Sequence, residues 1–511
     1  MNVASKNQFE FYASTIRRHL FTVAEKISLE AILIFWFAVT PLAAFYVRFP
    51  FEQSLITFDR LIFFLALLTL ALKFYRHKTF SDFNPHDNPA LTKKAVERTP
   101  DAGHRTLGTS DTRLQTFFIT KFELVWLLLS VIALASALLD ANNVGYAFKI
   151  AFDAFFLPLI AFHLARYHFD VGGRERAILA AAILLAFLLF FTGLFEFATG
   201  QNLFVYPGSE ILRERELRIN GLFASDSSFA IICLLLALFL RIAPALLEIK
   251  FDKTARLLYW TALAAIILAT LLPFFRATMV ALIICLLAIE ILLHLKRASG
   301  YQQNRSVAFS PLTYLRSHRT MAYALIAVVV LALGAAFIEM QSESSIVRRL
   351  TSPRNLYGRM ATWQTAARIA LEKPLFGVGL ANYADYFDTK FSDLKQQEDW
   401  VENVKAINAP HSNFILIMAE LGFFAFALYL LAYFYLISMG IRAFKRAQSR
   451  VQILAGGCFL LLLVAYTLPG MTLSSGVYAD LNLYFFFLLG LTSQDFGEPV
   501  APSVSASQPG E

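Results

Sequence analysis

Charged residues are scarce in this sequence. Only 16% of its 511 residues are Asp, Glu, Lys or Arg and 57% are hydrophobic, whereas charged residues average about 25% in globular domains. With so few charges, the chain cannot cover the surface of a soluble domain of this size. The composition therefore excludes an ordinary soluble protein and predicts an integral membrane protein.

Cysteine and the common nucleotide and metal motifs are also scarce or absent. The three cysteines, Cys233, Cys285 and Cys458, all lie inside apolar runs, where cysteine behaves as a small hydrophobic side chain rather than as part of a disulfide or metal framework. No Walker phosphate loop, dinucleotide fingerprint or HExxH sequence is present. Nucleotide-driven transport and zinc hydrolysis are therefore left without support.

Long apolar runs separated by polar connections make up most of the chain. Each approaches the roughly 20 residues that a helix needs to cross a bilayer. The first run, from Leu29, predicts a retained anchor rather than a cleaved signal peptide. We expect an all-α polytopic membrane protein with about twelve spans, at 29–47, 58–75, 123–140, 148–165, 177–198, 227–246, 257–275, 277–295, 321–339, 413–438, 451–468 and 475–493.

The basic residues predict the orientation of these spans. The net charge is +8, but lysine and arginine collect in alternate connections, which is a topology signal rather than a nucleic-acid-binding pattern. Both termini are then cytoplasmic. Two outer segments carry arginines that this rule does not predict. One is a long loop, and long loops cross the membrane regardless of their charge. The other, 199–226, is short, so its arginines indicate an anion that they face outside.

These spans and connections predict one membrane domain with polar extensions. We expect a cytoplasmic N-terminal tail (1–28), a transmembrane domain (29–493) with a flexible cytoplasmic loop (76–122) and a large outer loop (340–412), and a disordered cytoplasmic tail (494–511).

Within the large outer loop, an apolar pattern predicts a helix. Met360, Trp363, Ala367 and Ala370 recur at a spacing of three to four residues, and Pro374 stops the pattern. We expect a helix over 358–371 that lies along the membrane surface or packs on the bundle through this face.

One histidine stands out by its position. By the predicted topology, His411 is the only histidine on the outer side, between Pro410 and Ser412 at the start of an apolar run. The positive end of a helix dipole disfavours an imidazolium there, and a neutral imidazole is what a general base for a hydroxyl needs. A capping or interface histidine is the alternative.

Three arginines predict an anion site. Arg276 lies between two apolar runs, where an arginine is usually functional, although snorkelling to the interface is the alternative. Arg218 and Arg359 lie in outer segments. Because arginine offers paired donors to phosphate, three converging arginines suit a diphosphate, whereas each alone is a surface charge. Inside the tenth span, the acid Glu420 needs a partner such as an arginine.

The spacing around His411 resembles a family signature. His411-Ser412, nine residues and then Gly422 is similar to the signature of the bacterial O-antigen ligase and polymerase superfamily, although the family usually has Gly, Thr or Tyr where this chain has Ala425. The resemblance covers roughly 120–495. Three more stretches resemble family features: Arg218 to Phe223, Thr270 to Thr278 around Arg276, and Arg359 through Trp363 to Pro374-Leu375-Phe376-Gly377-Val378-Gly379.

The resemblance implies a reaction at the periplasmic face of the bacterial inner membrane. Family members use an undecaprenyl-diphosphate-linked glycan donor, with no cofactor, nucleotide sugar or required metal, and transfer the glycan to an acceptor hydroxyl in an inverting displacement. It implies that His411 activates that hydroxyl, that Arg218 and Arg276 hold the diphosphate, and that Arg359 assists or orders the loop. The expected substrate-binding residues are Arg359, Trp363, Tyr383 and Ser412.

The acceptor stays open at this point. A ligase transfers the glycan to lipid A-core to make lipopolysaccharide, whereas a polymerase extends another lipid-linked repeat unit, as in exopolysaccharide synthesis; transfer to protein is a third variant. A second class of function is a polysaccharide or lipid-linked glycan transporter or flippase. It predicts internal repeats and charges near the membrane midplane, whereas the unusual charges here cluster at the outer edge.

Overall fold

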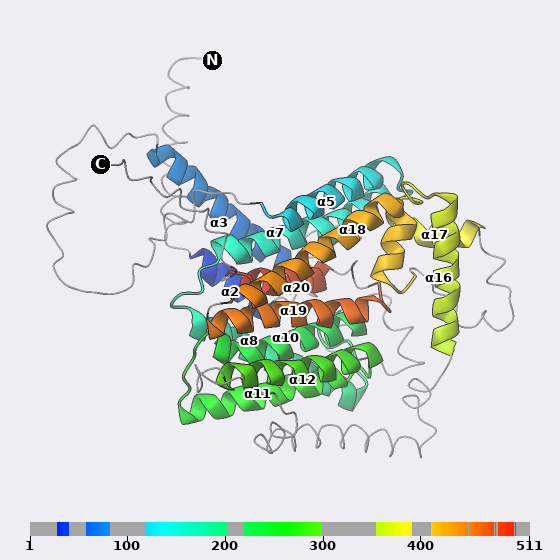
Figure 1. The fold of residues 1–511 in the computed structure, drawn as a ribbon. Helices are drawn as coiled ribbons and strands as arrows, with labels where there is room; N and C mark the ends of the chain where they lie inside the picture. The colour runs from blue at the N-terminus through cyan, green and yellow to red at the C-terminus, as the bar shows by residue number, and fades with distance from the viewer. Residues whose placement is uncertain are drawn as a thin grey trace, which may run out of the picture.

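The structure, a computed structural model, describes residues 28–39, 58–81, 119–201, 219–298, 354–390 and 410–496, apart from residues 224, 448, 475, 477, 478 and 495. Within these ranges the regular structure is helical throughout (Figure 1), which confirms the all-α prediction. Eight helices of the described part are long and apolar enough to cross a membrane. They are α5 (Lys121–Leu139), the continuous segment Val144–His168, α8 (Glu175–Thr199), α10 (Asp226–Leu246), α11 (Lys253–Leu271), α12 (Arg276–Ala298), α18 (Asn413–Arg446) and α19 (Arg450–Gly470).

The segment Val144–His168 is not a uniform α-helix. It consists of α6 (Val144–Ala151), η4 (Phe152–Phe156), α7 (Leu157–His163) and η5 (Leu164–His168), where η marks a π-helical turn. Three shorter apolar helices, α2 (Leu29–Val39), α3 (Phe58–Ser81) and α20 (Ala479–Thr492), complete the bundle.

Eight of the twelve predicted spans coincide with these eight long helices, so the protein is a polytopic membrane protein. The predicted spans 29–47, 58–75 and 475–493 coincide with α2, α3 and α20, whose apolar parts are shorter than a bilayer-crossing helix. The span 321–339 lies outside the described residues, as do the tail 1–27 and most of the loop 76–122. The number twelve and the predicted domain boundaries therefore stay predictions.

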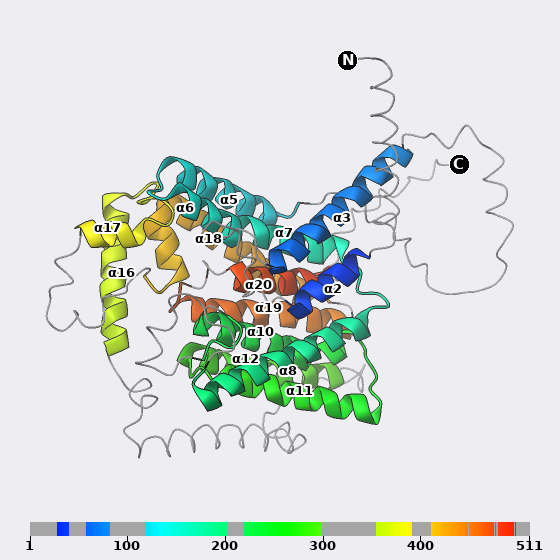
Figure 2. The same ribbon diagram turned by 180° about the vertical axis from the view of Figure 1, so that it is seen from behind.

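Two helices lie outside the bundle of spans. In Figures 1 and 2, α16 (Arg354–Glu372) runs across the ends of the spanning helices, and α17 (Tyr383–Lys390) lies beside it. We call this the site end of the bundle, because α18 begins there just after His411. At the opposite end, the Gln494 side chain donates to the carbonyls of Ala165 and Phe169, which joins the ends of α20 and η5.

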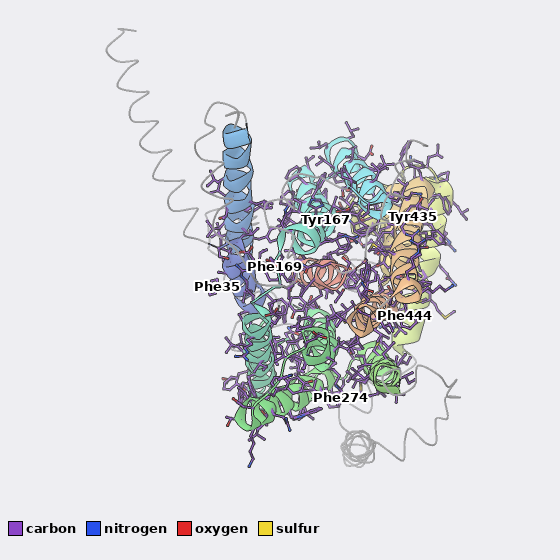
Figure 3. The ribbon with its side chains drawn as sticks, turned by 60° about the vertical axis from the view of Figure 1, so that its left-hand side comes forward. Phe35, Tyr167, Phe169, Phe274, Tyr435 and Phe444 are labelled. Carbon is purple, nitrogen blue, oxygen red and sulfur yellow. The ribbon has the colours of Figure 1, made fainter. Side chains whose placement is uncertain are left out.

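The interior is built around α10. Every residue from Ser227 to Leu240 on this helix is buried, as expected for a helix that is apolar on all sides. The three cysteines are also buried and free, as predicted. Large apolar side chains on peripheral helices face outward instead: Phe35 on α2 is 52% exposed, and Phe444 on α18 also lies on the surface of the bundle (Figure 3), where lipid covers such groups.

The helix predicted over 358–371 is α16, but the side that packs on the bundle agrees only in part with the predicted apolar face. Met360 and Ala367 are exposed, and the buried positions are Thr362, Thr365, Ala366, Ile369 and Ala370. The pattern misled because two threonines lie on the packed face. The Thr362 hydroxyl bonds to the Arg359 carbonyl of its own helix, so it is not required to face water.

Candidate active site

The helix that follows His411 is broken nine residues after Asn413. Gly422 has φ 79° and ψ 179° inside α18, a conformation that only glycine adopts without strain. The break removes the helical partners of the carbonyls of Ala419 and Glu420 and of the N–H of Phe423. In a membrane helix such groups need other partners, because lipid supplies none.

The turn between α16 and α17 supplies these partners. The N–H groups of Val378 and Gly379 donate to the carbonyls of Ala419 and Glu420 at 3.1 and 3.0 Å, and the Phe423 N–H donates to the Pro374 carbonyl at 2.7 Å. The two stretches that resemble the family therefore contact each other. The turn therefore supplies the hydrogen-bond partners that the break removes from α18.

Small residues make this contact possible. A Cβ atom on Gly422 would lie 2.3 Å from the Leu375 carbonyl oxygen, and one on Gly377 would lie 2.4 Å from the backbone of Glu420. No side chain fits at either distance. The match of Gly422 to the family signature therefore has a steric reason as well as a conformational one.

The Glu420 carboxylate also serves this contact. It is buried and accepts from the N–H of Tyr383 at 3.2 Å and from the N–H of Ala381, so it caps the start of α17. The arginine partner expected for Glu420 is thus replaced by backbone donors. On the other side of the turn, Asn382 bonds to the carbonyl of Asp140 and the N–H of Asn142, which fastens α17 to the end of α5.

His411 lies at the start of α18 in a left-handed backbone conformation, with φ 50°. This conformation is uncommon outside glycine and costs roughly 1–2 kcal/mol, and such strain concentrates at functional sites. The ring is half-buried, and Ser412 and Asn413 beside it are buried. His163 lies at the opposite end of the bundle, bonded to Glu123 at 2.7 Å.

The residue before His411 contacts α16. The Thr362 hydroxyl lies 3.3 Å from the Pro410 carbonyl, and the Thr362 carbonyl accepts from the Tyr383 hydroxyl at 2.9 Å. Tyr383 is fully buried, and this burial, with the nearby Glu420 charge, raises the pKa of its phenol above the usual range. Its hydroxyl is used within the protein, where it joins α17 to α16 beside His411.

Two of the three predicted arginines lie close together. Arg359 is half-buried on α16, one turn before Thr362, and burial together with the positive charge of Arg276 lowers the pKa of its guanidinium. Arg276 is exposed and begins α12, after a turn in which Phe274 has φ 50° (Figure 3). A helix N-terminus already disfavours a cation. Two like charges and a helix dipole therefore lie close together, an arrangement that favours a bound anion.

Trp363 adds an available donor next to Arg359. Its indole nitrogen is buried and has no hydrogen-bond partner among the described residues. Indole N–H groups usually find a partner when buried. A ligand oxygen at this position would supply one.

Arg218 lies outside the described residues. The segment that follows it is fixed at the site end: Ile219 is buried, and the N–H groups of Asn220 and Gly221 donate to the Glu196 carboxylate at 2.9 and 2.7 Å. Whether Arg218 joins Arg276 and Arg359 stays a prediction.

A buried polar network that the sequence analysis missed holds the start of α18. The Asn413 side chain accepts from the Gly476 N–H at 2.7 Å, and Asn482 donates to the Gly476 carbonyl at 2.6 Å while it accepts from the Tyr466 hydroxyl. These groups border a cavity of about 30 Å³, which has room for roughly two water molecules. The signal available in the sequence was the presence of amides in apolar runs.

Comparison with known proteins gives one match. Residues 261–430 match the family model of O-antigen ligase. This range contains Arg276, Arg359, Trp363, Tyr383 and His411, and it ends beyond Gly422. No curated protein matches the chain. The predicted resemblance is thus confirmed over 261–430, the region of the chain that is similar to O-antigen ligase.

Proposed function

We propose that this protein transfers a glycan from an undecaprenyl-diphosphate donor to an acceptor hydroxyl at the periplasmic face of the bacterial inner membrane. The observations that support the proposal are the contact of Thr362 with Pro410, beside His411, and the closeness of Arg359 to Arg276, all inside the region that matches O-antigen ligase. The reaction belongs to the synthesis of surface polysaccharide.

In the proposed reaction, His411 removes one proton. A ring nitrogen of the imidazole takes the proton of the acceptor hydroxyl as its oxygen attacks the anomeric carbon of the donor sugar. The bond between that carbon and the phosphate oxygen breaks, and undecaprenyl diphosphate leaves with the electron pair. One displacement inverts the anomeric configuration, and the base is restored when the proton passes to solvent.

The arginines act on the leaving group. A diphosphate gains negative charge as the sugar departs, and fixed cations stabilise that charge most effectively where water is excluded. This role is proposed for Arg276 and Arg359, which lie close together, and Arg218 is assigned the same role. Trp363 and Ser412 are assigned to substrate binding, because Trp363 has an unused donor and Ser412 adjoins the base.

A deletion strain that carries plasmid copies of the gene tests the proposal. Wild-type protein restores long surface glycans, and His411→Ala protein, present in the membrane at the same level, does not. Accumulation of unattached long chains on lipid carrier in the deletion strain identifies a ligase, whereas retention of single repeat units without long chains identifies a polymerase. Full restoration by His411→Ala overturns the proposal.

The orientation is tested separately. Single cysteines introduced at exposed positions, Thr389 on α17 and Arg442 on α18, report the two ends of the bundle. A membrane-impermeant thiol reagent labels the cysteine at 389 in intact spheroplasts and the cysteine at 442 only after lysis. The reverse pattern would place the site in the cytoplasm and exclude the proposed donor face.

A further inference from the structure

A second concave surface lies at the other end of α16. A groove of about 630 Å³ opens between the end of α5, the last turn of α16, the 374–378 turn and α17. This volume falls in the range of roughly 300–1,000 Å³ that small-molecule sites occupy. None of the residues assigned to the reaction lines it.

The lining of the groove has a definite chemistry. Three carboxylates, of Asp140, Glu372 and Asp385, face one ammonium, of Lys373. Two of these carboxylates are held in place by neighbouring polar groups: Asp385 accepts from the Asn142 amide at 3.0 Å, and Glu372 accepts from the Tyr386 hydroxyl at 2.6 Å. Each has a second oxygen that remains able to accept from a ligand hydroxyl.

One wall of the groove is aromatic and exposed. The Phe376 side chain is 65% exposed, although it lies on a turn whose backbone is fixed to α18. The neighbouring Leu375 is equally exposed, so the turn presents a small apolar patch at the groove, and contiguous exposed apolar groups are typical of ligand-binding grooves. Fixed carboxylates and amides beside an aromatic face suit a sugar, which presents hydroxyls at its rim and C–H groups on its faces.

We propose that this groove binds the saccharide of the acceptor, and that it selects neutral or amino sugars over acidic ones. The inference rests on the proposed function, because it assigns the groove to the acceptor of that reaction. A diphosphate or a uronic acid is repelled by three carboxylates, so the donor's charged group belongs at Arg276 and Arg359 and the acceptor belongs here.

The distance between the two places agrees with this division. Ten residues of α16 separate Thr362, beside His411, from Glu372 in the groove, which is about 15 Å at a helical rise of about 1.5 Å per residue. An acceptor that reaches from the groove to His411 is therefore an oligosaccharide rather than a single sugar.

Direct binding tests the inference without the transfer reaction. Full-length protein in lipid nanodiscs is titrated with maltoheptaose, chitohexaose, a chitosan hexamer and an oligogalacturonate of similar length, and binding is followed by saturation-transfer NMR. We expect one or more of the first three to bind and the oligogalacturonate not to bind. Binding of none of the four, or preference for the acidic oligosaccharide, overturns the proposal.

Matched variants locate the binding. Asp385→Asn and Phe376→Ala weaken binding by about tenfold or more, as expected for the loss of a charged hydrogen-bond acceptor or an aromatic contact. The controls are Asp388→Asn on the same helix and Phe424→Ala on α18, which lie outside the groove lining and leave binding unchanged. Equal affinity of Asp385→Asn, Phe376→Ala and wild-type protein overturns the site.

The two proposals fail in different ways. His411→Ala protein keeps full oligosaccharide binding if the groove is the acceptor site, whether or not transfer is lost. Loss of binding in His411→Ala, with the groove variants unaffected, places the saccharide at the base instead and overturns the groove.

Discussion

The two ends of α16 carry opposite charge. Near its start, Arg359 lies close to Arg276, and this second cation lowers the pKa of the Arg359 guanidinium. At its last turn, Glu372 joins Asp140 and Asp385 in a groove. One helix therefore presents a cationic and an anionic surface that are thirteen residues apart, roughly 3.6 turns. A transferase that handles a diphosphate and a hydroxyl-rich acceptor needs both surfaces, and it needs them separated.

The two ends also differ in how they are held. The cationic end depends on side chains: the Thr362 hydroxyl meets the Pro410 carbonyl, and Tyr383 bonds to Thr362. The acidic end has side-chain contacts through Glu420 and Asn382 and, in addition, three backbone hydrogen bonds between the 374–379 turn and the break at Gly422. Side-chain contacts adjust more easily than backbone ones, so we expect the reacting end to move on binding and the groove to stay rigid.

The largest effect is expected at the reacting end. His411→Ala lowers the transfer rate by about 10²–10⁴-fold, the usual contribution of a positioned general base. Transfer is measured with purified protein and lipid-linked donor, and the thermal unfolding of the variant is measured beside it. If the variant unfolds like wild type and still transfers at an undiminished rate, His411 is not the base, and the two ends of α16 do not differ in chemical role.

Replacing either arginine is expected to have the second largest effect on the transfer rate. Arg276→Gln and Arg359→Gln each lower transfer by about 10²–10³-fold, the usual loss for one group that stabilises charge in the transition state. Both variants should also lose the rise in unfolding temperature that pyrophosphate gives wild-type protein, since a ligand stabilises only the fold that binds it. Arg442→Gln, at the opposite end of α18, is the control and keeps that rise.

Breaking the backbone contact tests whether the acidic end is held as described. Gly422→Ala destabilises the fold by about 1–3 kcal/mol through backbone strain alone, and the contact with the Leu375 carbonyl adds to this. Gly200→Ala is the matched control, because Gly200 also has a positive φ, of 69°, but no atom lies within 4 Å of its added Cβ. Equal unfolding temperatures for the two variants would show that the turn does not pack against Gly422.

The smallest expected effect is on acceptor use. Asp140→Asn raises the acceptor KM by up to about tenfold, which corresponds to roughly one hydrogen bond to a charged group, and leaves kcat close to wild type. The measurement is steady-state transfer at varied acceptor concentration. A fall in kcat with unchanged KM would mean that Asp140 takes part in the reaction. The acidic end of α16 would then not be a separate acceptor-binding surface.

Sequence patterns predicted the parts of this molecule that depend on local composition. The eight long spans follow from apolar runs, His411 and Arg276 were identifiable as charged or titratable groups at span edges, and Arg359 was identifiable as a basic residue in an outer segment. The break at Gly422 was visible only as a spacing. Its reason lies in the 374–379 turn, more than forty positions earlier in the chain, and no local periodicity reports a contact at that distance.

Other differences from the predictions also come from contacts between distant parts of the chain. The packed side of α16 differs in part from the predicted face because Thr362 faces Pro410 rather than water. The Glu420 carboxylate was expected to meet an arginine, but it caps α17 with backbone donors. The acidic groove collects residues from α5, α16 and α17, each of which alone is an ordinary surface charge.

The contact between the 374–379 turn and α18 has a consequence for biogenesis. The ribosome delivers the turn before α18, so the carbonyls of Ala419 and Glu420 do not exist when Val378 and Gly379 emerge. The turn must wait unpaired until α18 inserts, and α18 enters the bilayer with an open break until the turn docks. Assembly of the site is therefore a late step, and a chain that stops before Ala419 leaves the turn without its partners, open to surveillance proteases.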